Sequence, residues 1–160
     1  MKESVVTFTL SGRSFAVSLS AVSEILRYCR FTPIPGVPGH VRGLLNLRGS
    51  LLAVVDPRVL LEIKDDSPDV SPALVLYTSG KSTENNQLTQ QQDNLVALLV
   101  DEIGDIVSPE ECSQHSLPAN VPESHRAFLA GVIDCGKASH TLINVDMITN
   151  PNLDNEKSGQ

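Results

Sequence analysis

Short apolar segments separated by turn-forming residues recur along the whole chain. Val5–Leu10 and Phe15–Leu19 flank Ser11-Gly12-Arg13, a pattern that is typical of a β-hairpin. Phe128–Cys135 and Ser139–Val145 predict a second hairpin towards the C-terminus. Further strands are expected within residues 43–55, 73–78, 95–101 and 103–107, and the last two are expected to pair with each other. Roughly nine or ten short strands predict an all-β protein of barrels or sandwiches.

The connections between these strands predict only short helices. Asp56 is suited to cap a helix that begins at Pro57 and ends near Glu62, because proline lacks the N–H that would have no partner there. Ser20–Leu26 fits either one short helical turn or the bulged continuation of a strand. Residues 32–39 and 108–127 contain three prolines each and predict irregular loops, and a short helix is expected to end near residue 151.

Residues 80–94, GKSTENNQLTQQQDN, are the most polar stretch, with Leu88 as their only apolar residue. Such a segment cannot bury enough surface to offset the entropy cost of ordering, so it predicts a mobile loop. Residues 152–160 are expected to form a disordered tail, since chain ends fray unless they are tied down.

The stretch GLLNLRGSLLAVVDP, residues 43–57, places a tight turn between two apolar runs. Asn is favoured at the first position of a type I turn and Gly at the fourth, so a turn over Asn46–Gly49 is expected, with Gly49 in the left-handed region as a G1 bulge. Arg48 would then lie outside both strand ladders. It is either a solubilising side chain or a rigidly held donor for carboxylates of a partner.

The second half of the chain repeats this pattern. GVIDCGKASHTLINVDM, from Gly131, again contains a glycine, aliphatic residues, a turn and a strand that ends at an aspartate, so that Gly43 corresponds to Gly131 and Asp56 to Asp146. The repeat predicts two similar β lobes, approximately residues 5–68 and 73–148, within one domain of residues 1–150. Chance similarity between two hairpins is the alternative. Five aliphatic side chains are expected in the core: Leu44, Leu52, Val54, Ile133 and Val145.

Charge is unevenly distributed along the chain of 160 residues, whose formal net charge is −7. Residues 1–60 carry seven basic and three acidic side chains, whereas the rest carry five basic and sixteen acidic ones. This asymmetry favours head-to-tail association with copies or relatives, although acidic residues on solvated loops would give the same distribution. Nucleic-acid binding is disfavoured because the basic residues are scattered and lack interleaved aromatic residues.

Cysteine usage and hydropathy favour a cytoplasmic protein. Cys29, Cys112 and Cys135 are far apart and odd in number, which predicts reduced thiols and no disulfide framework. No apolar run is long enough to span a bilayer, and the first residues lack the apolar region of a secretory signal.

Patterns for catalysis or metal binding are weak. Cys135 and His140 flank a predicted turn and form a conceivable thiolate–imidazole pair, but no third orienting group has matching spacing. His40, His115 and His125 form no metal-binding pattern, and no calcium loop or phosphate-binding loop is present. The sequence therefore predicts no enzyme, cofactor or metal site.

Four segments together resemble the CheW family of bacterial chemotaxis coupling proteins, whose fold also occurs in CheV and in the regulatory domain of the histidine kinase CheA. VRGLLNLRGSLLAVVD (residues 41–56) resembles the family's N-L-R-G segment with its flanking strands. VSEIL (22–26), LLVDEIGDIV (98–107) and FLAGVI (128–133) resemble further motifs in the family's order.

The resemblance implies an all-β fold of two five-stranded, SH3-like β-barrel lobes with short helices, which share a hydrophobic interface. It also implies a non-catalytic scaffold in chemosensory signal transduction. One face would bind the regulatory domain of a CheA-type histidine kinase, and a groove between the lobes would receive the cytoplasmic tip of a methyl-accepting chemoreceptor. Recruitment by receptors would bring the protein to the inner face of the membrane.

Eight residues fall on segments that the family uses for its partners: Val22, Glu24, Gly43, Asn46, Arg48, Gly49, Val100 and Asp101. The first two correspond to the segment that faces the kinase, and the last two lie near the receptor groove. Gly43 matches a glycine implicated in coupling, and Arg48 matches the family's functional arginine. The alternative is a CheW-like or other β-barrel interaction module in a non-motility pathway, or one that binds an anionic ligand through Arg48.

Overall fold

The computed structural model describes residues 3–64, 71–78 and 94–151. Its strands are β1 (Val5–Leu10), β2 (Arg13–Ser18), β3 (Val22–Cys29), β4 (Val41–Leu47), β5 (Ser50–Val55), β6 (Ser71–Tyr77), β7 (Leu95–Leu99), β8 (Glu102–Val107), β9 (Ser113–His115), β10 (Leu129–Asp134) and β11 (Ser139–Ile143). The helices of this part are short: α1 (Pro57–Leu60), α2 (Glu123–Arg126), α3 (Val145–Thr149) and the 3-10 turns η1 (Leu19–Ala21) and η2 (Pro109–Glu111). The predicted mobile loop, apart from Asn94, and the predicted tail lie outside the described residues.

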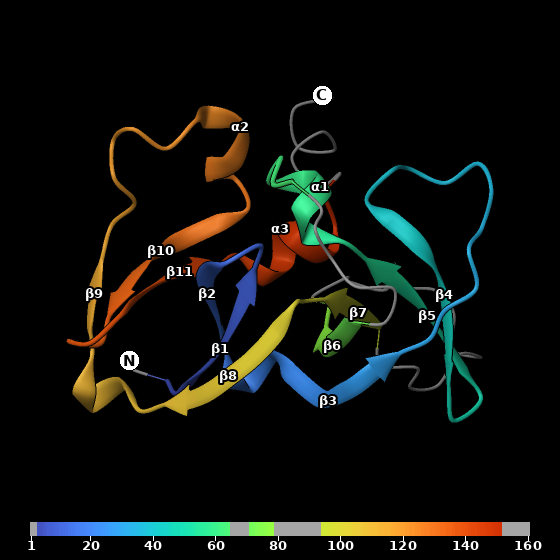
Figure 1. Ribbon diagram of the computed structural model, residues 1–160, viewed down its shortest axis with the longest axis horizontal. Helices are drawn as coiled ribbons and strands as arrows, with labels where there is room; N and C mark the ends of the chain where they lie inside the picture. The colour runs from blue at the N-terminus through green and yellow to red at the C-terminus, as the bar shows by residue number, and fades with distance from the viewer. Residues whose placement is uncertain (1–2, 65–70, 79–93, 152–160) are drawn as a thin grey trace, which may run out of the picture.

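The strands form two sheets that lie side by side along the long axis of the molecule (Figure 1). The six-stranded sheet has the order β8-β1-β2-β11-β10-β9 and is called lobe A here. The five-stranded sheet has the order β3-β6-β7-β5-β4 and is called lobe B. The expected all-β architecture of two lobes with short helices is confirmed. Lobe A has one strand more than expected, because the three-residue β9 joins β10 at its edge.

The sheets cut across the lobe limits inferred from the sequence, residues 5–68 and 73–148. Strands β6 and β7 belong to lobe B, and the N-terminal hairpin β1–β2 belongs to lobe A with β8–β11. The reason is long-range pairing: β1 pairs with β8, where Val5 is opposite Val107, and β7 runs parallel to β5. Each sheet therefore combines segments that are distant in the sequence.

The segments at residues 95–101 and 103–107 were expected to pair with each other, and this prediction is wrong. The chain passes from one lobe to the other between them. The amide of Val100 donates to Pro72 O (3.0 Å) in lobe B, whereas the amide of Asp101 donates to Thr9 O (2.9 Å) in lobe A. Two consecutive amides thus join different sheets, and no hairpin turn can form.

Side chains on the central strands of lobe B point alternately to the other lobe and to the interior of lobe B, and this explains how the two lobes pack. On β6, Leu74 and Leu76 belong to the core cluster between the lobes, whereas Ala73 and Val75 belong to the interior of lobe B. Successive side chains of a strand point to opposite faces, so a continuous apolar run is buried on both sides. A third cluster, which contains Val5, Ala16 and Ile133, lies in lobe A.

The predicted core list is correct for three of its five members. Leu52, Val54 and Ile133 are buried. Leu44 is half-buried because it lies on the opposite face of β4 from Leu45, whose side chain enters the lobe B core. Val145 is half-buried because it stands at the first position of α3 and packs against the rim of the core between the lobes.

The structure can be compared with the expectations for the short helices and loops. The side chain of Asp56 accepts a hydrogen bond from the amide of Arg58, with Pro57 at the first helical position, as predicted. The helix α1 ends at Leu60, shortly before the expected Glu62. Both alternatives for Ser20–Leu26 apply in part, because η1 is followed by β3. The predicted loop at residues 108–127 contains η2, β9 and α2.

The expectation of reduced thiols is wrong for two of the three cysteines. Cys112 and Cys135 form a disulfide, whereas Cys29 is free and buried. Ser113 pairs with Asp134 in the β9–β10 ladder, so the two cysteines are brought face to face immediately beyond that pair. A spacing of 23 residues gave no sign of this contact.

The conceivable Cys135–His140 pair does not form either. In the β10–β11 hairpin, His140 is opposite Ile133, and Cys135 lies in the turn. The Nδ1 atom of His140 lies 2.6 Å from Ser14 Oγ on the neighbouring strand β2, so the imidazole is held away from the turn.

Candidate partner-binding site

The turn at Arg48 is tighter than expected. Leu47 pairs with Ser50, so only Arg48 and Gly49 connect β4 to β5. Both residues have positive φ, 52° for Arg48 and 87° for Gly49, which defines a type I′ turn and excludes the predicted type I turn with a G1 bulge. Gly49 is left-handed, as predicted. The amide of Gly49 donates to Asn46 Oδ1 (3.0 Å), so Asn46 fixes the turn with its side chain.

Arg48 extends from this turn to Glu24 on β3. Its Nη1 and Nη2 atoms donate to the two carboxylate oxygens of Glu24, at 2.8 and 2.9 Å. The side chain of Arg48 is 75% exposed and that of Glu24 is 24% exposed. The hydrogen bond to Glu24, reinforced by the charge of its carboxylate, raises the pKa of Arg48. Because solvent screens such an exposed pair, it orients the guanidinium more than it stabilises the fold.

The Glu24–Arg48 pair helps to close lobe B on itself. Strands β3 and β4 are the two edges of this sheet, so their approach requires contacts outside the ladders. One contact is the ion pair, and another is the bridge between Thr32 and Leu44, whose amides each donate to the other's carbonyl oxygen at 2.9 Å. Val22 begins β3 and packs against the core between the lobes, so it is only partly accessible.

Gly43 supports this closure and is itself buried. A Cβ atom at this position would lie 2.2 Å from Thr32 O and 2.9 Å from the ring of Phe31, which is closer than real Cβ contacts allow. Only glycine lets the chain after β3 approach β4. The structure therefore gives Gly43 a packing role beneath the candidate surface.

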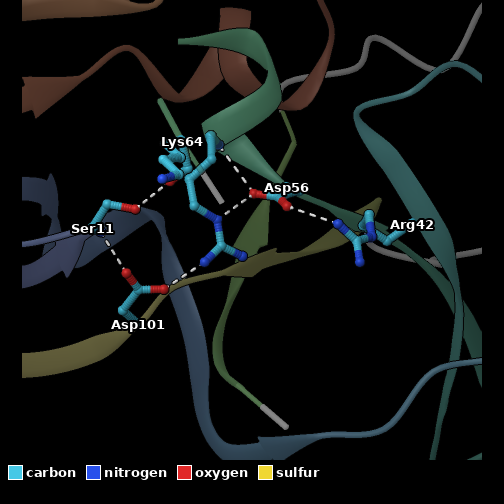
Figure 2. A network of polar contacts seen from close by, with 6 residues as sticks. Ser11, Arg42, Asp56, Lys64 and Asp101 are labelled. Atoms are coloured by element: carbon cyan, nitrogen blue, oxygen red, sulfur yellow. Dashed lines mark hydrogen bonds and ion pairs between the residues drawn. The ribbon is translucent and has the colours of Figure 1, made fainter. Parts of the chain in front are cut away.

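Val100 and Asp101 do not join this surface. Val100 is fully buried between the lobes, so its side chain is not available to a partner. Asp101 belongs to a separate polar network (Figure 2). Its Oδ1 accepts from Arg58 Nη1 and its Oδ2 accepts from the amide of Ser11, both at 2.5 Å.

Arg58 is the centre of that network, and the sequence did not single it out. Its guanidinium is buried, with 1% of the side chain exposed, and its Nε donates to Asp56 Oδ1 at 2.8 Å. Arg42 approaches the other oxygen of Asp56 at 3.2 Å (Figure 2). The network thus joins α1 of lobe B to the β1–β2 turn of lobe A. A basic residue two positions after a capping aspartate was the available signal.

Buried polar side chains of the described residues are satisfied, since none of their buried N or O atoms lacks a hydrogen-bond partner. A buried charge that is fully paired fixes geometry, because any displacement would leave an ionised group without solvent. We infer that the arrangement of the two lobes at this point is tightly specified.

The candidate surface also carries exposed apolar side chains. Tyr28 on β3 is 74% exposed, Leu51 on β5 is 66% exposed and Ile25 on β3 is 43% exposed. Ile25 follows Glu24 but lies on the other face of β3, because Glu24 pairs with Val75 of the lobe B interior and Ile25 pairs with Leu74 of the core between the lobes. Leu51 is opposite Asn46 in the hairpin that carries Arg48. We call Glu24, Asn46, Arg48 and Leu51 the β3–hairpin surface. Exposed apolar surface near an oriented ion pair is typical of protein interfaces.

Other kinds of site find little support. Among residues 3–64, 71–78 and 94–151, no group of three or more metal-ligating side chains converges. No helix of this part is long and apolar enough to cross a membrane.

Comparison with known proteins assigns the family. Residues 4–150 match the model of the CheW-like domain. The chain belongs to the CheW-like domain family. This CheW-like chain is 27% identical over 144 residues to the chemotaxis protein CheW of Rhizobium meliloti, with 90% of the chain and 85% of that protein covered. It is 24% identical over 156 residues to the chemotaxis protein CheW of Bacillus subtilis, with 98% and 90% covered.

A solved structure confirms the CheW-like fold. The scaffolding protein TtCheW from Thermoanaerobacter tengcongensis superposes with a TM-score of 0.73 at 18% identity, over 94% of each chain. The similarity therefore spans both lobes and the crossover between them.

Proposed function

We propose that this CheW-like chain is a non-enzymatic adaptor that couples methyl-accepting chemoreceptors to a CheA-type histidine kinase. Relatives of similar length are named chemotaxis proteins, and one solved structure is that of a scaffolding protein. The adaptor would act in the cytoplasm, at the inner face of the membrane, where receptor tips recruit it.

The observation that carries the proposal is the oriented arginine of the β3–hairpin surface. A two-residue turn with both φ angles positive leaves Arg48 little backbone freedom, and Glu24 holds its guanidinium by both terminal nitrogens. A partner that binds there pays little entropy to order the side chain. The guanidinium fork suits a carboxylate, and Leu51 adds exposed apolar surface on the same hairpin.

We assign this surface to the regulatory domain of the kinase. Val22 and Glu24 then act from β3, with Asn46 and Gly49 holding the turn in place. Gly43 acts indirectly, by allowing β3 and β4 to close. The receptor contact is assigned to the boundary between the lobes, which Val100 and Asp101 support from within.

The test is a charge reversal with a matched control. Arg48→Glu places two carboxylates together and removes the donor, so affinity for a kinase regulatory-domain fragment should fall by about tenfold or more, equivalent to about 1.4 kcal/mol. Arg13→Glu changes the same charge beside the similar β1–β2 turn of lobe A, and should bind like the wild type. Melting temperatures of both variants should stay close to that of the wild type, because exposed substitutions rarely exceed about 0.5 kcal/mol.

A charge swap distinguishes an Arg48 that contacts the partner from an Arg48 that only stabilises lobe B. The double variant Glu24→Arg/Arg48→Glu restores the ion pair with opposite polarity. If the partner recognises the arginine, binding stays weak although the ion pair is restored. Recovery of wild-type affinity by the swap would show that the pair serves only the fold of lobe B and would overturn the assignment of this surface.

A further inference from the structure

The disulfide between Cys112 and Cys135 lies at the edge of lobe A, away from the β3–hairpin surface. Cys112 directly precedes β9, and Cys135 directly follows β10. Their Cα atoms are 4.2 Å apart. Both residues are partly exposed, so a small reagent can reach them.

We propose that Cys112 and Cys135 form a reversible thiol–disulfide modification site, which glutathione disulfide oxidises and small thiols reduce, and whose closure fixes β9 onto the β10–β11 hairpin. The proposal rests on the geometry of lobe A and is independent of the adaptor function.

β9 depends on this cross-link more than the other strands of lobe A do. It has only three residues, all exposed, and only three register pairs with β10. It is the last strand of its sheet, so its other edge pairs with no strand of the described residues. Segments with few buried contacts open locally at low free energy. The disulfide adds a covalent restraint at the N-terminal end of such a segment.

A pocket of about 190 Å³ is lined in part by Cys112. β9 and the residue before it supply one wall through Cys112, Ser113 and Gln114, and Ile133 and Val107 line the apolar side. The segment that the disulfide holds is therefore also a wall of the pocket. Reduction frees this wall and lets a pocket that is already open to solvent widen.

The third cysteine does not compete for this chemistry. Cys29 is 2% exposed in the interior of lobe B. Burial raises the pKa of its thiol, because the thiolate would lose solvation there. The thiolate is the reactive species in thiol–disulfide exchange, so Cys29 remains inert while the pair in lobe A reacts.

The two sulfurs have different charged neighbours along the chain. Cys135 lies in an exposed turn between Asp134 and Lys137, whose opposite charges offset each other, whereas Cys112 follows the carboxylates of Glu110 and Glu111. Anionic glutathione disulfide is therefore repelled less at Cys135 than at Cys112, so Cys135 attacks first.

The thiol–disulfide exchange with glutathione disulfide then proceeds in two steps. The Cys135 thiolate attacks one sulfur of glutathione disulfide, forms a mixed disulfide and releases one glutathione thiolate. The Cys112 thiolate attacks the protein sulfur of that mixed disulfide and releases the second glutathione. Two electrons pass from the protein sulfurs to glutathione disulfide, and the two thiol protons end on the two glutathione molecules.

The experiment uses the full chain in buffers that range from reduced glutathione to glutathione disulfide. Alkylation followed by peptide mass spectrometry measures free thiols, and hydrogen exchange measures the protection of β9. In the oxidised buffer, Cys112 and Cys135 should lose all alkylation together while Cys29 is unchanged, and dithiothreitol should restore both. Reduction should speed exchange of the β9 amides by about tenfold or more, with no change in β6.

Single variants test the order of attack and need no intact cross-link. Cys112→Ser should accumulate glutathione at Cys135 faster than Cys135→Ser accumulates it at Cys112. Cys29→Ser serves as the matched control and should keep the full response of the pair. Persistent alkylation of both cysteines in glutathione disulfide would overturn the modification site. Equal β9 exchange in the oxidised and reduced wild type would overturn its role in fixing β9.

Discussion

Removal of the buried guanidinium of Arg58 should destabilise the protein strongly. Arg58→Met keeps much of the apolar stem but leaves Asp56, which is fully buried, and Asp101, whose side chain is 18% exposed, without their shared cation. Breaking a buried pair by removing one partner costs about 3–5 kcal/mol. The lower end applies here, because Arg42 and the amide of residue 58 still contact Asp56. We expect a loss of about 3 kcal/mol in the free energy of unfolding.

Urea denaturation followed by circular dichroism measures this loss as a lower midpoint at an unchanged slope. Asp101→Asn should cost less, because the amide oxygen still accepts a hydrogen bond and the site is partly open to water. The double variant should be less destabilised than the sum of the two, by at least about 0.5 kcal/mol, since both changes disrupt one contact.

Arg13→Met is the matched control, because Arg13 is exposed on β2, and it should stay within about 0.5 kcal/mol of the wild type. An Arg58→Met variant as stable as this control would refute the reasoning. It would mean that the buried charges contribute no net stability and that the lobes are held together by the apolar core alone.

Three further substitutions test the close approach at Gly43, the turn at Gly49 and the pH dependence due to His40. Gly43→Ala should cost about 2–4 kcal/mol in urea denaturation, because the added Cβ displaces Thr32 and breaks two hydrogen bonds to Leu44; wild-type stability would contradict that close approach. Gly49→Ala should cost only about 1–2 kcal/mol, since space is open around Gly49 and only its positive φ resists a side chain; a larger loss would indicate a clash. Burial lowers the pKa of His40 below its ordinary value of 6.5, so the unfolded chain binds more protons and stability should decline as the pH falls below 6.5. His40→Gln should flatten this decline, and an unchanged pH profile of the melting temperature would assign it to other groups.

Local features of this protein followed from the sequence, because they depend on residues that are neighbours in the chain. The two hairpins were placed correctly, and so were the left-handed Gly49 and the cap of α1 by Asp56. Turn chemistry and helix caps act over a few residues, so their signals survive without knowledge of the fold. The resemblance to the CheW family likewise rested on local patterns, the N-L-R-G segment together with three further motifs.

Pairing over long distances was decided only by the tertiary structure. The apolar runs of β7 and β8 are adjacent in sequence and looked like partners, yet they belong to different lobes. An apolar run indicates that a strand is buried, but it does not indicate which strand is its partner. That choice depends on the register of several strands at once.

The site residues divide in the same way. The sequence identified Arg48, but only the closure of lobe B brought its guanidinium to Glu24, 24 positions away. The place of Arg58 after the capping Asp56 was visible but its burial was not, and the cross-link between Cys112 and Cys135 was invisible along the chain. A charge or a thiol has no fixed role until the fold supplies its neighbour and excludes water, and both are set by segments that meet only in three dimensions.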